Sequence, residues 1–424
     1  MTKMKLKIPF SPPDMSEEEA KEVKEAILSG WITTGPRTKK LEAQISEYVG
    51  TVKAVCLSSA TAAMEMMLHL LDVQPEDEVI VPAYTYTATA SVTQHVGCRL
   101  VMVDSQKDNV EMDYEQLEQA ITERTKVIMP VDIAGIVADY DRVYEIVERK
   151  KKLFRPANAL QAKIGRVVVA ADCAHAFGAV RKGKMAGAIA DFSAFSFHAV
   201  KNFTTAEGGA LSWKLPFGNE IVPTNIDYMP AVPKKEGETW NEMLYRISQL
   251  FSLHGQNKDA LAKTKVGMWE YDIIGPWYKC NMTDIMASIG LVQLQRYPKM
   301  LERRQKIVAR YNAALRGLNV AVLNHKDAEH CSSHHLYMVR LPGKSREEVN
   351  RVMEQMAERG IATNVHFKPL PMMTAYKTLG FRIADYPNAY HLFENEITLP
   401  LYTRLTDEEV DYVITNFVDV IRNL

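Results

Sequence analysis

Residues 53–71 read KAVCLSSATAAMEMMLHLL, and the pattern changes in the middle of this stretch. The first part, KAVCLSS, is a short apolar run typical of a buried strand, whereas ATAAMEMMLHLL has the length and composition of a helix. The same pair returns directly afterwards, with EVIVP at Glu78–Pro82 and the helical segment ATASVTQHV at 88–96. Short apolar runs that alternate with helices are typical of parallel β-α units.

The alternation continues along the chain. RLVMVD, KVIMPVD and RVVVAAD read as further strands at Arg99–Asp104, Lys126–Asp132 and Arg166–Asp172, with a helix at Asp139–Lys150 between the last two. Such strands form a parallel sheet that helices cover on both faces, so we predict an α/β fold. Ligands of these folds bind at the carboxyl ends of the strands. Here those ends carry the polar sequences SSAT, PAYTYT, DIAG and DCAH.

The two ends of the chain do not follow this alternation of strands and helices. Ser16 and Glu19 form a capping-box start for an N-terminal helix, and Thr406 and Glu409 do so for the last one. After Met282 we expect a long helix to Leu315, a strand at 334–341, a helix at 347–359 and a short strand, TNVHF, at 363–367. We therefore predict a large domain over 1–280, with a helical arm at 1–50 and a surface insertion near 214–242. A smaller α+β domain follows over 281–424.

Composition excludes several classes of protein. The chain has 424 residues, of which 47% are hydrophobic and 24% charged, and a formal net charge of −1. This balance gives no basic field for nucleic acid or an acidic membrane. The longest apolar runs are far shorter than the roughly 20 residues that span a bilayer, and the N-terminus has no apolar signal region. The five cysteines are scattered without C-x-x-C, which favours reduced thiols in the cytoplasm and argues against a zinc site or other metal centre.

Lys201 is the first candidate for chemistry. It lies between FSAFSF, which reads as a buried strand, and AEGGAL, which reads as a tight turn into another strand. A desolvated lysine has a lowered pKa and can attack aldehydes. The alternative is a surface lysine with its stem on apolar neighbours, which is the more common case.

Other polar groups at strand ends fit the same chemistry. Asp172 ends the strand RVVVAAD, where it either caps a turn or pairs with a cationic ring nitrogen, as pyridoxal phosphate (PLP) requires. The SSAT turn either caps a helix or offers backbone amides and hydroxyls to a phosphate. Tyr86 either packs or stacks on a flat ring. The chain has neither the Gly-rich loop of dinucleotide-binding folds nor that of P-loop enzymes.

Together these motifs resemble one family, the DegT/DnrJ/EryC1/StrS aminotransferases, over nearly the whole chain. These are PLP-dependent enzymes of fold type I that mostly aminate keto-sugar nucleotides. The resemblance implies a large domain with a mostly parallel seven-stranded sheet between helices, and a smaller C-terminal domain. The motifs that carry it are SGWITTGPR (29–37), SSATAAM (58–64), DEVIVPAYTYTATA (77–90), ADCAHAFGA (171–179), FSFHAVKNFTTAEGGAL (195–211), YKCNMTDIMASIG (278–290) and TNVHFKPL (363–370).

The resemblance also implies roles for individual residues. Lys201 matches the lysine that binds PLP covalently and then carries the 1,3-proton transfer, and Asp172 matches the partner of the pyridine nitrogen. Tyr86 stands where an aromatic ring stacks on the cofactor, and His175 beside the ring hydroxyl. The matches to phosphate ligands are Ser59, Ala60, Thr61 and Ser196, and those to substrate-contacting residues are Thr33, Thr34 and His366. Lys279 and Asn281 resemble a segment that reaches the phosphate of the neighbouring subunit, which implies a homodimer with shared active sites.

Some positions depart from the family pattern. Ala60 replaces the usual glycine of the phosphate turn, so its φ must be negative. His175 replaces a glutamine, and Lys279 and Asn281 replace a common Asn and Arg pair.

The resemblance implies transfer of an amino group from L-glutamate, with 2-oxoglutarate as product, to a nucleotide-linked 3- or 4-keto sugar. The pathway would be amino-sugar or cell-surface polysaccharide biosynthesis. Amination of a keto-inositol is an alternative. A second alternative is keto-sugar dehydration, although that branch of the family has histidine in place of the lysine. A non-catalytic regulator on the same fold would be expected to lack Lys201 or Asp172.

Overall fold

A computed structural model describes residues 6–257 and 270–424. Its centre is a seven-stranded sheet with the order β1-β9-β8-β5-β4-β2-β3. Neighbouring strands from β3 to β8 are parallel, and β9 is antiparallel to both β8 and β1. The predicted mostly parallel sheet is therefore confirmed. The strands are β1 (Ala54–Leu57), β2 (Glu78–Pro82), β3 (Arg99–Val103), β4 (Thr125–Ile128), β5 (Val168–Asp172), β8 (Phe192–Ser196) and β9 (Gly209–Trp213).

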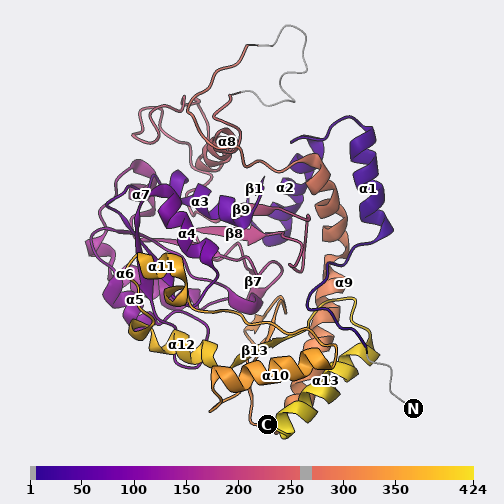
Figure 1. The fold of residues 1–424 in the computed structure, drawn as a ribbon. Helices are drawn as coiled ribbons and strands as arrows, with labels where there is room; N and C mark the ends of the chain where they lie inside the picture. Colours follow the sequence, from indigo (N-terminus) through magenta and orange to yellow (C-terminus); the bar gives the residue numbers. More distant parts are fainter. Residues whose placement is uncertain (1–5, 258–269) are drawn as a thin grey trace.

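Helices cover both faces of this sheet (Figure 1). Successive residues of a strand face opposite sides, so Val79 and Val81 of β2 join one apolar cluster and Ile80 joins the other. The first cluster includes side chains of α3 (Ala60–Leu70), α4 (Thr87–Val96), α7 (Ala159–Ile164) and α8 (Trp240–Ser252). The second includes α2 (Pro36–Val49), α5 (Tyr114–Ala120), α6 (Tyr140–Arg149) and the first half of α9 (Asp284–Leu315).

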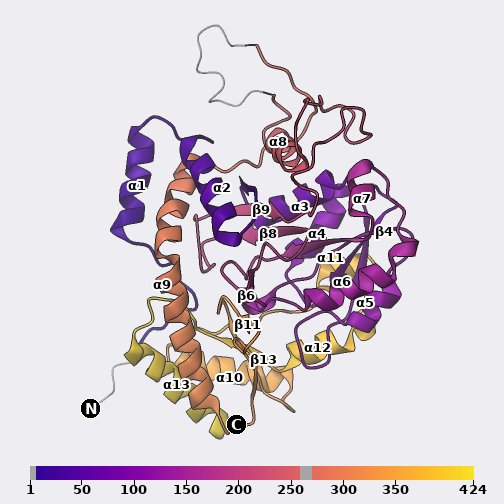
Figure 2. The same cartoon turned by 180° about the vertical axis from the view of Figure 1, so that it is seen from behind.

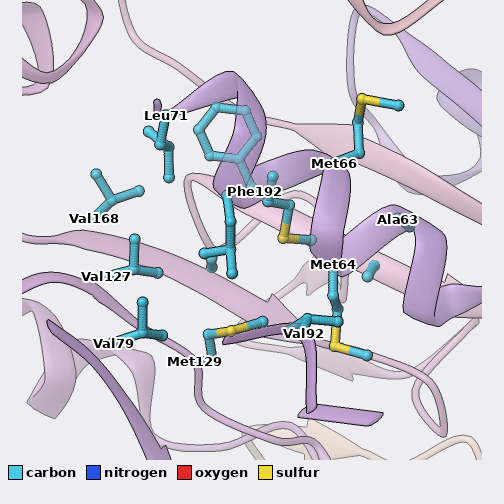
Figure 3. Close-up of a cluster of buried hydrophobic side chains, with 14 of the residues drawn as sticks. Ala63, Met64, Met66, Leu71, Val79, Val92, Val127, Met129, Val168 and Phe192 are labelled. Atoms are coloured by element: carbon cyan, nitrogen blue, oxygen red, sulfur yellow. The ribbon is translucent and has the colours of Figure 1, made fainter. Parts of the chain in front are cut away.

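Figure 3 shows part of the first cluster, to which Ala63 and Met64 of α3 and Val127, Val168 and Phe192 of the sheet belong. Each of these valine, methionine and phenylalanine side chains is fully buried. Burial of one such side chain stabilises the fold by about 1.5–3 kcal/mol. The alternating strands and helices of the sequence thus supply one continuous core on each side of the sheet.

A second, smaller sheet lies at the other end of the molecule. It contains β10 (Ala321–Val322), β12 (Tyr337–Arg340) and β13 (Glu396–Leu399) in that order. Its own apolar cluster includes α10 (Arg346–Glu358), α13 (Asp407–Arg422) and the second half of α9, together with Ile8 from the N-terminal segment. Further elements are β6 (Val180–Arg181), β7 (Lys184–Met185), β11 (His330–Cys331), α11 (Thr374–Thr378) and α12 (Pro387–Glu394).

Helix α9 connects the two units and packs in both (Figure 2). Pro298 lies inside it, between the halves. Helix α1 (Glu17–Leu28) packs along the first half, where Gln293 donates to Glu19 at 2.7 Å. A domain boundary at 280/281 stays a prediction, with α9 as the element that both domains share.

Several local expectations have clear outcomes. The capping boxes of Ser16 and Thr406 are both present. The predicted strand TNVHF is wrong: only Asn364 pairs with the backbone of Thr398. The segment at 214–239 consists of turns, with one bridge between Ile221 and Thr239, and its side chains Phe217, Tyr228 and Val232 are buried in the first cluster. In the described part of the chain, no helix is both long and apolar enough to cross a membrane.

Candidate active site

One cavity, of about 370 Å³, lies where β2, β5 and β8 end and α3 begins, and we call it the main cavity because most of the predicted site residues line it. Nine of the side chains predicted from the sequence line it, and they come from distant parts of the chain. These are Ser59, Ala60, Thr61, Tyr86, Asp172, His175, Ser196, Lys201 and His366. The small domain closes the cavity with His335, Leu336 and Phe367, and the N-terminal segment adds Phe10.

Lys201 lies in the turn that follows β8. Its backbone N–H donates to the carbonyl of His198 at 2.9 Å, and the neighbouring Asn202 donates to the carbonyl of Ser333 at 2.7 Å. Burial lowers the pKa of the Lys201 ammonium to about 8, against a weaker opposing effect of Asp172. About a tenth of this amine is therefore neutral near pH 7, and the neutral amine is the form that attacks an aldehyde.

Asp172 ends β5 and is 4% exposed. Its Oδ2 accepts a hydrogen bond from the hydroxyl of Thr89 at 2.7 Å, and its Oδ1 accepts one from the backbone of Ala174 at 3.0 Å. Burial raises the pKa of this carboxyl, while these two hydrogen bonds and Lys201 act in the opposite direction. Sequence reasoning missed Thr89, because a threonine inside a helical segment carries no signal of its own.

The start of α3 forms the end of the cavity where a phosphate fits. Ser59 caps the helix by accepting from the amide of Ala62 at 3.0 Å, and Ala60 is the first helical residue, with a negative φ. The alanine is therefore compatible with this turn. On the other side, β9 approaches so closely that a Cβ on Gly209 would lie 2.3 Å from the carbonyl carbon of Ser59. Amides at the start of a helix, beside Thr61 and Ser196, suit an anion.

Two neutral histidines lie side by side in the cavity. Nδ1 of His175 accepts from the amide of Ala134 at 3.2 Å, so its proton is on Nε2. The ring centroids of His175 and His335 are 4.4 Å apart, and His335 makes a 2.9 Å hydrogen bond to Asn202 through Nδ1. Burial, with the charge of Lys201, lowers the pKa of His175 well below its usual value. His335 is a further residue that the sequence did not reveal.

Tyr86 is at the mouth of the cavity and is 60% exposed. Its ring centroid is 6.0 Å from that of Phe367. An aromatic side chain in this position leaves one side of the ring accessible to a ligand.

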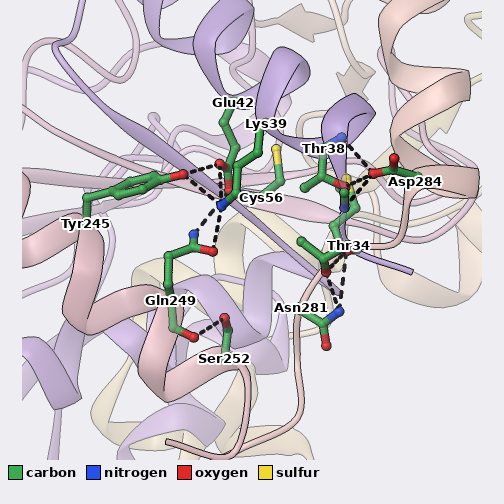
Figure 4. Close-up of polar contacts among 12 residues, drawn as sticks. Thr34, Thr38, Lys39, Glu42, Cys56, Tyr245, Gln249, Ser252, Asn281 and Asp284 are labelled. Atoms are coloured by element: carbon green, nitrogen blue, oxygen red, sulfur yellow. Dashed lines mark hydrogen bonds and ion pairs between the residues drawn. The ribbon is translucent and has the colours of Figure 1, made fainter. Parts of the chain in front are cut away.

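The other four predicted residues do not line this cavity. Thr34 and Asn281 line a second one, of about 650 Å³, where Nδ2 of Asn281 donates to the hydroxyl of Thr34 at 2.5 Å (Figure 4). Lys279 is exposed and donates to Asn281. The carbonyl of Thr33 accepts from the amide of Asp284 at 3.0 Å.

The residues of the main cavity fit PLP on their own geometry. One end offers helix amides in a cradle that a Cβ at Gly209 would fill. The same cavity is lined by the buried carboxyl of Asp172 and by Lys201, whose pKa is lowered toward neutrality. These are the three groups that a phosphate, a pyridine nitrogen and an aldehyde require.

The comparison with known proteins agrees with this geometry. The sequence pattern of the DegT/DnrJ/EryC1/StrS aminotransferase family matches residues 13–418. The chain belongs to this family. The PLP form of the putative sugar aminotransferase Spr1654 from Streptococcus pneumoniae is 53% identical, with a TM-score of 0.90 and coverage of 99% of both chains. A PMP form of Spr1654 matches equally well, with a TM-score of 0.90.

Two further relatives cover almost the full length. Spore coat polysaccharide biosynthesis protein SpsC of Bacillus subtilis is 32% identical over 98% of this chain and 97% of its own. PseC of Helicobacter pylori, an aminotransferase involved in the biosynthesis of pseudoaminic acid, is 25% identical with a TM-score of 0.83, over 99% of this chain and 100% of its own. The chain is thus a PLP-dependent aminotransferase of the sugar aminotransferase family, with fold type I.

Proposed function

We propose that this enzyme moves an amino group from L-glutamate to a nucleotide-linked 3- or 4-keto sugar. The observation that carries the proposal is the pairing of Lys201 with Asp172 in one cavity, because both are needed for transamination and neither is needed for a binding protein. PLP, when bound, supplies an electron sink for the carbanion at the α-carbon of the amino donor.

The side chains divide the remaining work. With PLP bound, Nζ of Lys201 would accept and carry the proton of the donor's α-carbon, which requires the neutral amine that burial favours. Asp172, oriented by Thr89, would hold the proton on the pyridine nitrogen of bound PLP. We further propose that Ser59, Ala60, Thr61 and Ser196 bind the phosphate, that His175 lies beside the ring hydroxyl, and that Tyr86 stacks on the ring.

We also propose a homodimer with shared active sites. Lys279 and Asn281, which do not line the main cavity of their own subunit, would reach the phosphate in the partner's cavity, and Thr33 and Thr34 would contact substrate from the same surface. The five cysteines, free in this structure, support a reducing cytoplasmic location. SpsC, a relative that acts in polysaccharide biosynthesis, supports a role in that pathway. Keto-inositol amination remains a second candidate, whereas the presence of Lys201 argues against the dehydratase and Asp172 with Lys201 against the regulator.

The test is the visible absorption spectrum of the protein reconstituted with PLP, before and after addition of L-glutamate. We expect a yellow band that converts to the pyridoxamine form and returns when a UDP- or dTDP-linked keto sugar is added. The Lys201→Ala variant is the control and should give no such band. A wild-type band that ignores L-glutamate would refute the proposed donor, and one that returns only with a keto-inositol would refute the nucleotide sugar.

A further inference from the structure

A chain of hydrogen bonds links the fully buried Glu396 to His366, which lines the main cavity. Glu396 and Thr398 are two residues apart on β13 and therefore face the same side of the strand. The hydroxyl of Thr398 is 2.5 Å from Oε1 of Glu396 and 2.9 Å from Nδ1 of His366. The backbone N–H of His366 donates to Oε2 of the same carboxyl at 2.9 Å.

The number of protons allows only two arrangements of this chain. A hydroxyl has one proton, so Thr398 donates one of its two hydrogen bonds and accepts the other. When Glu396 is ionised, Thr398 donates to Oε1 and accepts from Nδ1–H of His366. When Glu396 is protonated, Oε1–H donates to Thr398, and Thr398 donates to Nδ1. Since His366 is neutral, its single ring proton is then on Nε2.

The two arrangements differ in whether Nε2 of His366 carries a proton inside the main cavity. Among the described residues, Nε2 of His366 has no hydrogen-bond partner, so it is available to a ligand. We propose that Glu396 and Thr398 are positioning residues: the protonation state of Glu396, transmitted by the hydroxyl of Thr398, decides whether Nε2 of His366 offers the cavity an acceptor or a donor. The inference rests on the proposed function in one respect, namely that a keto sugar carries both hydroxyls and a carbonyl oxygen.

The charges around Glu396 come from several elements. Arg346 of α10 donates to the carbonyl of Glu396 at 2.7 Å, and Arg340 of β12 pairs with Glu396 in register. Arg340 is itself 3.4 Å from Asp108 and donates to His391 at 2.6 Å. Tyr84, after β2, donates to the carbonyl of His366 at 2.5 Å.

The pKa values of Glu396 and His366, the two titratable groups in this chain of hydrogen bonds, are both strongly shifted. Burial raises the pKa of Glu396 to about 8, against the hydrogen bonds of Thr398 and His366 and the charge of Arg346. Burial and Lys201 lower the pKa of His366 to about 3, so that it stays neutral. Glu396 therefore gains or loses its proton near physiological pH. We expect the donors and acceptors in the hydrogen bonds from Glu396 through Thr398 to His366 to exchange roles when it does.

The decisive experiment reads the tautomer by ¹⁵N NMR of the holoenzyme labelled in histidine, at pH of about 6.5 and about 9.5. His366 is assigned by the loss of its signals in the His366→Gln variant. We expect the proton on Nε2 at the lower pH and on Nδ1 at the higher one. The same tautomer at both pH values in the wild type would overturn the proposal.

Three variants test the path. Glu396→Gln places an amide donor opposite Thr398 and should hold the proton on Nε2 at both pH values. Thr398→Val breaks the chain and should remove the pH dependence, whereas Thr398→Ser keeps the hydroxyl and should preserve it. A pH-dependent tautomer that survives Thr398→Val or Glu396→Gln would contradict the path, and thermal melting verifies that each variant is folded.

Kinetics supply a second readout. With dTDP-4-keto-6-deoxyglucose as probe, Thr398→Val should raise KM about tenfold, because an oriented hydrogen bond to the substrate is lost. The half-reaction with L-glutamate should be unchanged in this variant. Thr398→Ser, which keeps the hydroxyl, should have the wild-type KM. Equal losses in both half-reactions would contradict the positioning role. Failure of the wild type to use this probe or L-glutamate would count against the proposed function alone, because the NMR measurement requires neither.

Discussion

At the scale of the residue, the ionisation of Lys201 makes a first prediction. Its pKa of about 8 means that only the neutral fraction of the apoenzyme reacts with PLP. The rate constant for PLP binding should therefore rise about tenfold per pH unit below pH 8 and level off above it. Stopped-flow absorbance on the apoenzyme measures this. By linkage, a lowered pKa means that the unfolded chain holds more protons between about pH 8 and 10.4, so stability should rise with pH in that window.

Asp172→Asn is the matched control for this profile. The carboxylate of Asp172 opposes the lowering of the Lys201 pKa, so its removal should shift the point where the rate levels off to lower pH. A wild-type profile that keeps rising to pH of about 10.4 would show an unperturbed lysine and contradict the burial argument.

Thr89 gives a second prediction at this scale. Loss of its 2.7 Å hydrogen bond to Asp172 in Thr89→Val leaves a buried carboxyl with less support for its ionised form, so kcat should fall about tenfold. Asp172→Asn should lower kcat by a factor of about 10²–10⁴, the range for a group that acts on a proton in the transition state. Thr87→Val, at an exposed site two residues earlier in α4, is the control and should keep nearly full activity. Steady-state kinetics would contradict the role of Thr89 if both threonine variants behaved alike.

At the scale of the secondary-structure element, the side chain of Glu42 connects three elements, α2, β1 and α8 (Figure 4). From α2 it accepts from the backbone of Cys56 in β1 at 3.0 Å and from the hydroxyl of Tyr245 in α8 at 2.6 Å. Glu42→Ala should lower the free energy of unfolding by about 2–4 kcal/mol, because it leaves the buried amide of Cys56 without its acceptor and removes the ion pair between Glu42 and Lys39. Urea denaturation measures this loss. The exposed Glu47 on the same helix is the control, and Glu47→Ala should change it by less than about 0.5 kcal/mol. Equal effects of the two variants would mean that the network contributes nothing.

The sequence predicts the elements of the large domain better than those of the small one. Strand β2 has the predicted bounds, because EVIVP is buried on both faces and reads as an apolar run. In TNVHF the pattern was misleading: the amide of His366 donates to the side chain of Glu396 rather than to the backbone of β13, so the pairing stops after Asn364. Side-chain acceptors of this kind have no periodicity in the sequence.

The residues of the candidate site also fall into two groups, those that the sequence predicted and those that it did not. Strand ends indicated Asp172 and Lys201, because the carboxyl ends of parallel strands gather at one edge. His335 and Thr89 come from segments whose spacing says nothing about the cavity, and only the packing of the small domain against the sheet brings His335 beside His175.

At the scale of the whole molecule, the predicted site residues divide between two cavities. Lys201 and Asp172 line the main one, whereas Asn281 lines the second and Lys279 lies exposed beside it. One folded chain therefore does not assemble every residue that the family resemblance implies. A two-fold dimer, in which the same surface contacts the partner in both directions, would complete two sites at once.

Complementation between two inactive variants tests this arrangement. One variant carries Lys201→Ala, and the other carries Lys279→Ala with Asn281→Ala. If the sites are shared, a heterodimer places both defects in one site and leaves the other intact, so the purified heterodimer should have about half of wild-type activity. Lys201→Ala paired with Asp172→Asn is the control, since both residues line the main cavity of one subunit, and every site would keep one defect. Activity is measured on co-purified, differently tagged heterodimers. No recovery in the first pair would mean that Lys279 and Asn281 act within their own subunit, and recovery in the control pair would mean that Lys201 and Asp172 do not belong to one site.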